Sequence, residues 1–311
     1  MHISVCCFDK HFRKIIYTSL LTILFRYPIG HPEIITSNFK DLNEYEGLVK
    51  CTVLPPRQLF HPVLPYRKDK LLFPLCRTCA DEMNQNECHH SEKERQLTGT
   101  WVLLEVQEAL RQGYTLIETF EVWHYAETRE YDPQTKTGGL FSSFIDTWLK
   151  LKQEASGFPA WCKSDEDKTR YVKEYYEKEG IQLDYNNIKK NPGLRSLAKL
   201  MLNSFWGKFG QRPNMPKNKF FTQPDEFYRY MNDDSLEIQD IRLLPDEEAG
   251  MLVQYKKKDE FVEELCNTNV VIAAYTSCHA RLKLYTYLET LQENVLYMDT
   301  CLLYTSPSPR D

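Results

Sequence analysis

The apolar residues of this chain form short runs and helically spaced stripes, which Pro, Gly and polar residues interrupt. Apolar or alternating runs bounded by such residues predict β-strands, here at residues 48–54, 115–125, 238–244, 251–255 and 295–298. Apolar positions three and four residues apart predict α-helices, here at residues 101–111, 140–155, 165–178, 194–205, 225–231 and 269–291. No internal repeat is visible, and helices and strands mix without strict alternation. The pattern predicts an α+β fold.

Two of the predicted helices have start signals. Thr98 and Thr100 stand where caps of the first helix would lie, because their hydroxyls can accept hydrogen bonds from unpaired N–H groups of a first turn. Ser164 and Asp167 are three residues apart at the start of the third helix, which is the spacing of a capping box.

The composition is that of a globular protein with an apolar core. Hydrophobic residues make up 42% and charged residues 27% of the 311 positions, as in ordinary soluble domains. At about 150 residues per domain, the length allows one large or two modest domains. The 12 Gly and 16 Pro are too few for a fibrous or wholly disordered chain.

No apolar run reaches the roughly 18 residues that a membrane-spanning helix needs, so no membrane association is expected. The nearest candidate, residues 15–25, follows Lys10, Arg13 and Lys14 as in a signal peptide, but Arg26 stands where a small residue should mark the cleavage site. Secretion is the alternative. Most of the ten cysteines are scattered, which favours an intracellular, reducing location. The compartment stays open between the nucleus, a mitochondrion and a viral factory.

Basic residues are concentrated in one segment. The whole chain carries a net charge of −5, which excludes a basic coat over the entire surface. Residues 185–224 contain eight Lys or Arg and no Asp or Glu, which leaves −13 on the remaining residues. Such segregation suits a phosphate-binding surface on an otherwise acidic protein. A solvated loop beside a basic helix is the alternative.

Within this segment, Arg195, Lys199 and Asn203 recur every four residues and therefore share one face of a helix. Lys199 supplies a point charge that suits a triphosphate, and Arg195 a planar fork for a second phosphate. Asn203 and Trp206 could contact a base or sugar, and Gly207 allows a ligand to approach the backbone closely. The apolar residues of this helix are expected to pack inward: Leu197, Leu200, Met201 and Phe205.

The stretch from Lys199 to Gly207, Lys-Leu-Met-Leu-Asn-Ser-Phe-Trp-Gly, resembles the K-x-x-x-N-S-x-Y-G fingers motif of family B DNA polymerases, with Trp206 in place of the usual Tyr. It is most similar to the protein-primed branch, found in phages, adenoviruses, linear plasmids and self-synthesising transposons. The resemblance implies that Lys199 contacts the phosphates of an incoming deoxynucleoside triphosphate and that Asn203, Trp206 and Gly207 lie near nucleotide or template. It also implies a DNA template and primer, a terminal priming protein and Mg²⁺ as partners and cofactor.

A second stretch carries the metal-binding part of the resemblance. Phosphoryl transfer by a polymerase uses two divalent cations, and hard cations prefer carboxylate ligands. Tyr297-Met298-Asp299-Thr300 resembles the first half of the Y-x-D-T-D-S motif, which implies that Asp299 is a catalytic Mg²⁺ ligand. Cys301 stands where the second Asp is expected, and the upstream D-x-x-S-L-Y-P motif is absent. We therefore expect that this chain alone cannot polymerise DNA.

The resemblance covers about residues 27–300 and implies part of a right-hand polymerase, with the exonuclease and thumb missing. The expected division is an unmatched leader at 1–26, a palm segment with an insertion at 27–184, the fingers helix and basic loop at 185–224, and a further insertion and palm at 225–300. Residues 301–311 match, codon by codon, the translation of a transposase sequencing adaptor. We interpret them as an artefact; a short hydrophilic tail is the alternative.

Cysteine and histidine cluster once in the chain. Cys76 and Cys79 form a C-x2-C pair that Cys88 and His90 follow, and these four side chains can close a tetrahedral Zn²⁺ site, with His89 as the alternate fourth ligand. Because no position would stay open, the zinc would be structural and would fix the insertion. Free cysteines in a surface hairpin are the alternative.

The leading interpretation is a DNA-directed DNA polymerase fragment, and two other functions are open. One is a non-catalytic nucleic-acid-binding remnant of a mobile element that keeps the zinc knuckle and the basic helix. The other is a template-independent or RNA-directed nucleotidyltransferase, against which the fingers motif speaks. On the last long helix, Arg281 could face primer phosphates or the solvent.

Overall fold

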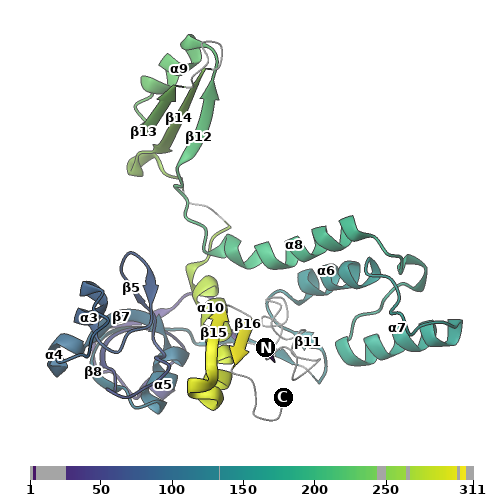
Figure 1. The fold of residues 1–311 in the computed structure, drawn as a ribbon, viewed down its shortest axis with the longest axis horizontal. Coiled ribbons are helices and arrows are strands. Elements are labelled where there is room, and N and C mark those ends of the chain that lie inside the picture. The colour runs from purple at the N-terminus through teal and green to yellow at the C-terminus, as the bar shows by residue number, and fades with distance from the viewer. Residues whose placement is uncertain are drawn as a thin grey trace. The chain divides into compact units, whose positions relative to one another are not determined.

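The computed structural model describes residues 3–4, 26–132, 134–243, 250–263, 267–299 and 302–305. The chain divides into two compact units. The larger unit comprises residues 1–207 together with 270–311, and the smaller one comprises residues 208–269. Both units combine helices with strands (Figure 1), so the predicted α+β class is confirmed.

A four-stranded antiparallel sheet in the order β3-β8-β4-β7 is the centre of the larger unit. Its strands are β3 (Glu33–Ile35), β4 (Gly47–Leu54), β7 (Leu97–Val102) and β8 (Thr115–His124). The central strand β4 places Val49 opposite both Trp101 of β7 and Val122 of β8. Val49, Cys51 and Val53 are fully buried, because alternate residues of a strand point to the same face of the sheet.

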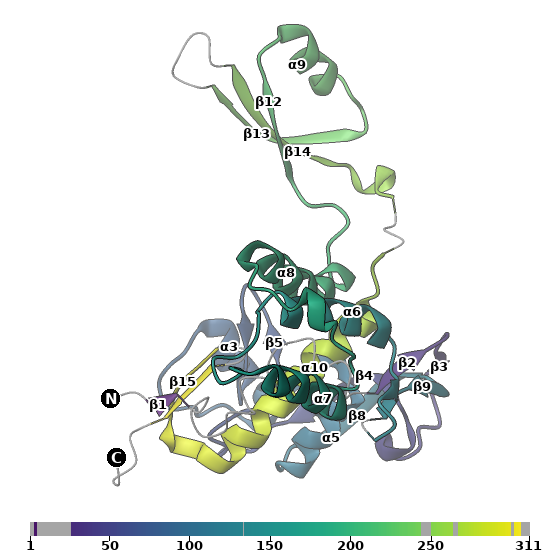
Figure 2. The same cartoon turned by 90° about the vertical axis from the view of Figure 1, so that its right-hand side faces the viewer.

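Helices α5 (Leu103–Arg111) and α10 (Val270–Leu291) complete this core. Leu103 and Val106 of α5 join Tyr285 and Leu288 of α10 and the buried residues of β4 in one apolar cluster. Figure 2 shows α10, in yellow, running beside the elements of the sheet. The core therefore unites segments that are far apart in the sequence.

Short elements surround the sheet. Strand β2 pairs with β9, β5 with β6, β10 with β11, and β15 with β16, which also pairs with β1. Their bounds are β1 (Ile3–Ser4), β2 (Tyr27–Ile29), β5 (Tyr66–Arg67), β6 (Leu71–Leu72), α3 (Arg77–Glu82), α4 (Glu92–Arg95), β9 (Glu127–Arg129), β10 (Tyr131–Asp132), β11 (Thr137–Gly138), β15 (Val295–Asp299) and β16 (Leu302–Thr305). Single 3₁₀ turns lie at Leu42–Glu44, Tyr185–Asn187, Asp259–Phe261 and Gln292–Asn294.

Helices α6 (Ser142–Glu154), α7 (Asp165–Glu179) and α8 (Pro192–Phe209) follow one another, and α8 lies along α6 (Figure 1). The predicted capping box of α7 is confirmed: Ser164 Oγ accepts a hydrogen bond from Asp167 N at 3.1 Å, and Asp167 Oδ2 accepts one from Ser164 N at 3.2 Å. Among the helices that the structure describes, none has both the length and the apolar character needed to cross a membrane.

The smaller unit is a three-stranded antiparallel sheet in the order β12-β14-β13 with one helix. Its elements are β12 (Lys217–Phe221), α9 (Pro224–Met231), β13 (Leu236–Leu243) and β14 (Met251–Lys257). Phe221 and Val253 are fully buried, and the ring of Phe227 lies 6.1 Å from that of Phe221. These contacts join α9 to the sheet.

Two local predictions were wrong. The helix expected from residue 101 begins at Leu103, because Thr98 and Thr100 belong to β7 and pair with β4 instead of capping a helix. Strand β12 was not predicted, since its Lys- and Asn-rich sequence is typical of a loop. It is a strand because five of its residues pair with β14, a partner that local sequence does not reveal.

Polar contacts fix the first half of α10 to the segment that enters β2. Tyr27 Oη lies 3.2 Å from Thr276 Oγ1, and His279 Nε2 lies 3.1 Å from the carbonyl oxygen of Arg26. The His279 ring is 6% exposed and contacts the rings of Tyr27 and Tyr275 at 5.7 and 5.8 Å. This burial lowers the pKa of His279 from 6.5 to about 4, although the Arg26 carbonyl acts in the opposite direction.

We predict that His279 makes folding stability depend on pH. Its pKa is lower in the folded than in the unfolded chain, so the unfolded chain binds more protons between pH 6.5 and about 4. The contribution is therefore fully present above pH 6.5 and is lost as the pH falls through this window, by about 3 kcal/mol in total. Urea unfolding should show a shallower pH slope for His279→Gln. The exposed His31→Gln is the control; equal slopes for both variants would contradict the prediction.

Candidate nucleotide-binding helix and metal centre

Helix α8 has a defined start. Pro192 is its first residue, where a missing N–H costs nothing and the fixed φ suits the helix. Asn191 precedes it, and its Oδ1 accepts a hydrogen bond from Leu194 N at 3.0 Å. From there the helix is continuous, so residues four apart stay on one side. The structure leaves the predicted polar residues of that side, Arg195, Lys199 and Asn203, exposed, and Gly207 is exposed as well.

The inward face of α8 differs from the predicted one. Ala198, Leu202 and Trp206 are buried, whereas Leu197 and Leu200 are 48% and 61% exposed. The predicted packing role of Leu197 and Leu200 is therefore wrong, while Met201 and Phe205 are half-buried. The start of α6 contacts the C-terminal part of α8, where Phe141 meets Trp206 and Phe144 meets Phe205. A helix with apolar residues on most sides does not indicate by itself which stripe is covered.

Aromatic rings attach α8 to the start of α6. The Phe205 ring stacks on Phe144 at 4.2 Å, and the Trp206 ring meets Phe141 edge-on at 5.5 Å. Trp206 is only 6% exposed as a result. Its ring is thus a packing element in this arrangement, and its direct contact with a nucleotide stays a prediction.

The two cations of the exposed side differ in how they are held. Arg195 Nε donates to Ser156 Oγ at 3.2 Å, and that hydroxyl donates to the Lys152 carbonyl at 2.7 Å. The end of α6 therefore orients the guanidinium. In the part of the chain that the structure describes, no carboxylate forms an ion pair with Arg195 or Lys199. Both charges are available to an external anion.

A cavity of about 590 Å³ lies at the end of α8. Trp206 and Gly207 form one side, Arg281 and Tyr285 of α10 another, and Met298 of β15 a third. The cavity thus connects the end of the candidate nucleotide-binding helix with the strand that ends at Asp299. The side chain of Asp299 itself lies outside the described residues.

Arg281 pairs with a buried carboxylate. Glu105 of α5 is 2% exposed, and Arg281 Nε donates to its Oε1 at 2.7 Å. Burial raises the pKa of Glu105, and the charge of Arg281 opposes that shift. Arg281 was expected either to face primer phosphates or to be a free surface charge. The ion pair with Glu105 fits neither expectation. Sequence reasoning missed the pair because its members are 176 residues apart.

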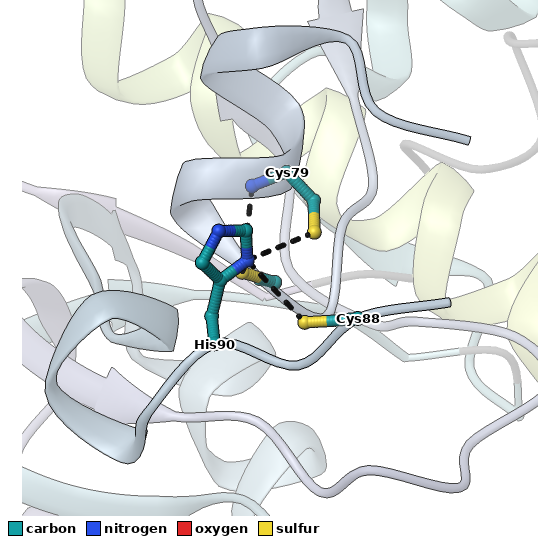
Figure 3. A group of neighbouring side chains, drawn as sticks. Cys79, Cys88 and His90 are labelled. Atoms are coloured by element: carbon teal, nitrogen blue, oxygen red, sulfur yellow. Dashed lines mark hydrogen bonds between the residues drawn. The ribbon is translucent and has the colours of Figure 1, made fainter. Parts of the chain in front are cut away.

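The Cys/His cluster converges in three dimensions. The ligand atoms of Cys76, Cys79, Cys88 and His90 all lie within 4.8 Å of one another. His90 Nδ1 is 3.5 Å from the sulfur of Cys76, 3.3 Å from that of Cys79 and 3.6 Å from that of Cys88. Figure 3 shows the imidazole nitrogen pointing toward the sulfurs of Cys79 and Cys88. His89, the alternate fourth ligand, is exposed and lies outside this group.

The thiols of the cluster differ in acidity. Burial and the neighbouring sulfurs raise the pKa of Cys79 to about 12. Burial acts to raise the pKa of Cys88 as well. Hydrogen bonds with His90 act in the opposite direction and are stronger, so the net pKa of Cys88 is lowered to about 7. The thiolate is the form that binds metals, and the surroundings of Cys88 favour it more than those of Cys79 do.

The family described as DNA polymerase type B, organellar and viral, matches residues 16–293. The chain belongs to this family. No curated protein sequence matches it significantly.

Solved structures of Phi29 DNA polymerase have a similar fold. The ternary complex with primer-template DNA and incoming nucleotide substrates has a TM-score of 0.52 and 15% identity over 94% of this chain and 37% of that chain. The orthorhombic crystal form has a TM-score of 0.50 and 13% identity over the same shares. This type B polymerase chain therefore spans about 37% of the length of the solved protein, and the predicted family and partial polymerase fold are confirmed.

The Mg²⁺ site that the family implies is not complete in the described residues. A two-metal polymerase site needs several carboxylates at one place. In the described ranges, the Cys/His cluster is the one group of three or more potential ligands that comes together. The Y-x-D-T motif supplies Asp299. At the next position where the pattern has an acidic residue, this chain has Cys301. These residues do not fit two divalent cations.

We predict that the Glu105–Arg281 pair is critical for folding. Arg281→Met leaves Glu105 buried without its charge partner and should lower the free energy of unfolding by about 3–5 kcal/mol. Glu105→Gln keeps a hydrogen-bonding group and should cost less. Urea denaturation measures both.

Lys173→Ala is the matched control for this experiment. Lys173 makes a 3.7 Å ion pair with Glu177, and both side chains are mostly exposed. Such surface pairs contribute less than about 1 kcal/mol. If Arg281→Met costs no more than Lys173→Ala, the pair has no special structural role.

Proposed function

We propose that this chain forms the fingers and palm elements of a protein-primed, DNA-directed DNA polymerase, which adds deoxynucleotides to a primer. The proposal rests on one observation above all: α8 exposes two cations and an amide on one side, with no acidic side chain paired to either cation in the described structure. An uncompensated pair of charges at fixed spacing suits the phosphates of a nucleotide. Family membership supports the reaction class.

Each residue of this face has a proposed role. Lys199 neutralises the triphosphate as a point charge, and Arg195, oriented by Ser156, binds a second phosphate oxygen through its planar fork. Asn203 lies one turn further and would hydrogen-bond to sugar or base, while Gly207 leaves room at the backbone. A Cβ at Gly207 would meet no atom within 4 Å, so open space adjoins the helix there.

The proposed partners are primer-template DNA, deoxynucleoside triphosphates and a terminal priming protein, in an intracellular compartment. Phi29 DNA polymerase, which has the same fold, has been solved with primer-template DNA and incoming nucleotides. Catalysis also needs divalent cations, which activate the 3′-hydroxyl and stabilise the leaving pyrophosphate when bound. Asp299 would be one ligand of an incomplete set, because Cys301 stands where the pattern has the second Asp.

We predict that the 311-residue chain does not extend a primer, because it supplies one carboxylate of the pattern and Cys301 in the position of another. Extension of a labelled primer on a template with Mg²⁺ should stay at the level of the Lys199→Ala variant. Extension clearly above that variant would show that the chain completes the site in another way.

In a polymerase with the complete D-T-D-S and D-x-x-S-L-Y-P motifs, we predict that Lys199→Ala lowers kcat/KM for the incoming nucleotide roughly 10- to 100-fold. This corresponds to the loss of about 1.4–2.7 kcal/mol of transition-state stabilisation. Folding should be unaffected because Lys199 is exposed. Steady-state extension kinetics at varied nucleotide concentration measure the effect.

Lys173→Ala on α7 serves as the control, since it removes an exposed lysine from another helix. Unchanged kinetics in Lys199→Ala would remove this residue from the site. If Lys199→Ala weakened DNA binding but left the dependence of the rate on nucleotide concentration unchanged, the result would instead favour a nucleic-acid-binding remnant.

A further inference from the structure

We propose that Cys76, Cys79, Cys88 and His90 bind one structural Zn²⁺, which fixes the segment from β6 to α4 against the central sheet. The proposal is independent of polymerase activity. It rests on the arrangement of three sulfurs around one imidazole nitrogen.

Hydrogen bonds alone do not account for three such contacts. A neutral or protonated imidazole Nδ1 has one lone pair or one hydrogen, so it can make one strong hydrogen bond. Here it lies 3.3–3.6 Å from three sulfurs at once. With Zn–S of about 2.3 Å and Zn–N of about 2.0–2.1 Å, a tetrahedral site has N···S edges of about 3.6 Å. A central cation explains the spacing.

The backbone around α3 directs N–H groups toward two of the sulfurs. Cys76 is the residue before α3, and its Sγ accepts a hydrogen bond from Cys79 N at 3.4 Å. Met83, the residue after α3, has the left-handed conformation, with φ of 54°. This turn brings Asn84 Nδ2 to 3.8 Å from the Cys79 sulfur. N–H groups directed at sulfur stabilise thiolates, as in the outer shells of metal sites.

Residues outside the cluster hold the segment that carries Cys88 and His90. Arg57 donates to the carbonyl oxygens of Cys88 at 3.3 Å and of His90 at 2.9 Å. His90 Nε2, on the far side of the ring, lies 4.0 Å from the Glu82 carboxylate, and a carboxylate near that nitrogen is typical of metal-bound histidines. With three thiolates and one neutral imidazole, the occupied site carries a net charge of −1, and any proton still on a thiol is released when the metal binds. No position is left for a substrate, so the zinc is structural.

The metal would stabilise more than its own loop. Arg95, at the end of α4, is 4% exposed and donates to the carbonyl of Pro55 at 2.8 Å, with that of Leu75 at 3.4 Å. It thereby joins the segments on both sides of the site to the end of β4. Leu71 and Phe73, just before Cys76, line the cavity beside Trp206 and Gly207. The zinc site thus anchors one wall of that cavity.

Metal analysis of the full chain, purified without chelator, tests the proposal directly. We expect about one equivalent of zinc in the wild type, and a loss of at least about tenfold in Cys88→Ser and His90→Ala. Cys162→Ser and His89→Ala are the matched controls and should keep the metal, since both residues lie outside the cluster. Less than about a tenth of an equivalent in the wild type, with no uptake of added Zn²⁺, would overturn the proposal.

Wild-type protein provides a second test that does not depend on variants folding. Co²⁺ in place of Zn²⁺ should give the intense visible bands of a tetrahedral thiolate site, and Zn²⁺ should displace it. Removal of metal by a chelator should increase amide hydrogen exchange in residues 71–95 while α7 keeps its protection. Absence of the cobalt bands, or unchanged exchange in residues 71–95, would contradict a structural zinc.

Discussion

The packing of Phe205 and Trp206 on Phe144 and Phe141 is the interaction on which the candidate site depends. It decides which side of α8 is covered by α6, and hence that Lys199 and Asn203 face the solvent. Rotation of the helix by one residue would bury part of this polar side. The aromatic contacts therefore constrain the candidate site as well as stabilising the fold.

Charge is distributed in two different ways in this molecule. On α8, the exposed cations Arg195 and Lys199 have no carboxylate partner in the described structure, so water solvates them and an anion can reach them. In the lining of the cavity beside Trp206 and Gly207, Arg281 forms an ion pair with Glu105. A buried charge without such a partner would cost several kcal/mol. Nearby basic residues thus have opposite roles, and burial explains the difference.

The segment between β6 and α4 has little apolar material of its own. Of α3 and α4, only Ala80 and Arg95 are buried. Short helices with so small a core are marginal in isolation. Cross-links from side chains, and from a metal where ligands converge, replace the apolar contacts that this segment lacks.

Local sequence determined much of this protein. The capping box at Ser164 and the long helix before β15 follow from contacts between residues a few positions apart, and both were predicted. Tertiary structure alone decided the rest. It turned Leu197 and Leu200 outward, made Lys217–Phe221 a strand and gave Arg281 its partner. These outcomes depend on partners distant in the chain, whose positions a local pattern of polar and apolar residues does not contain.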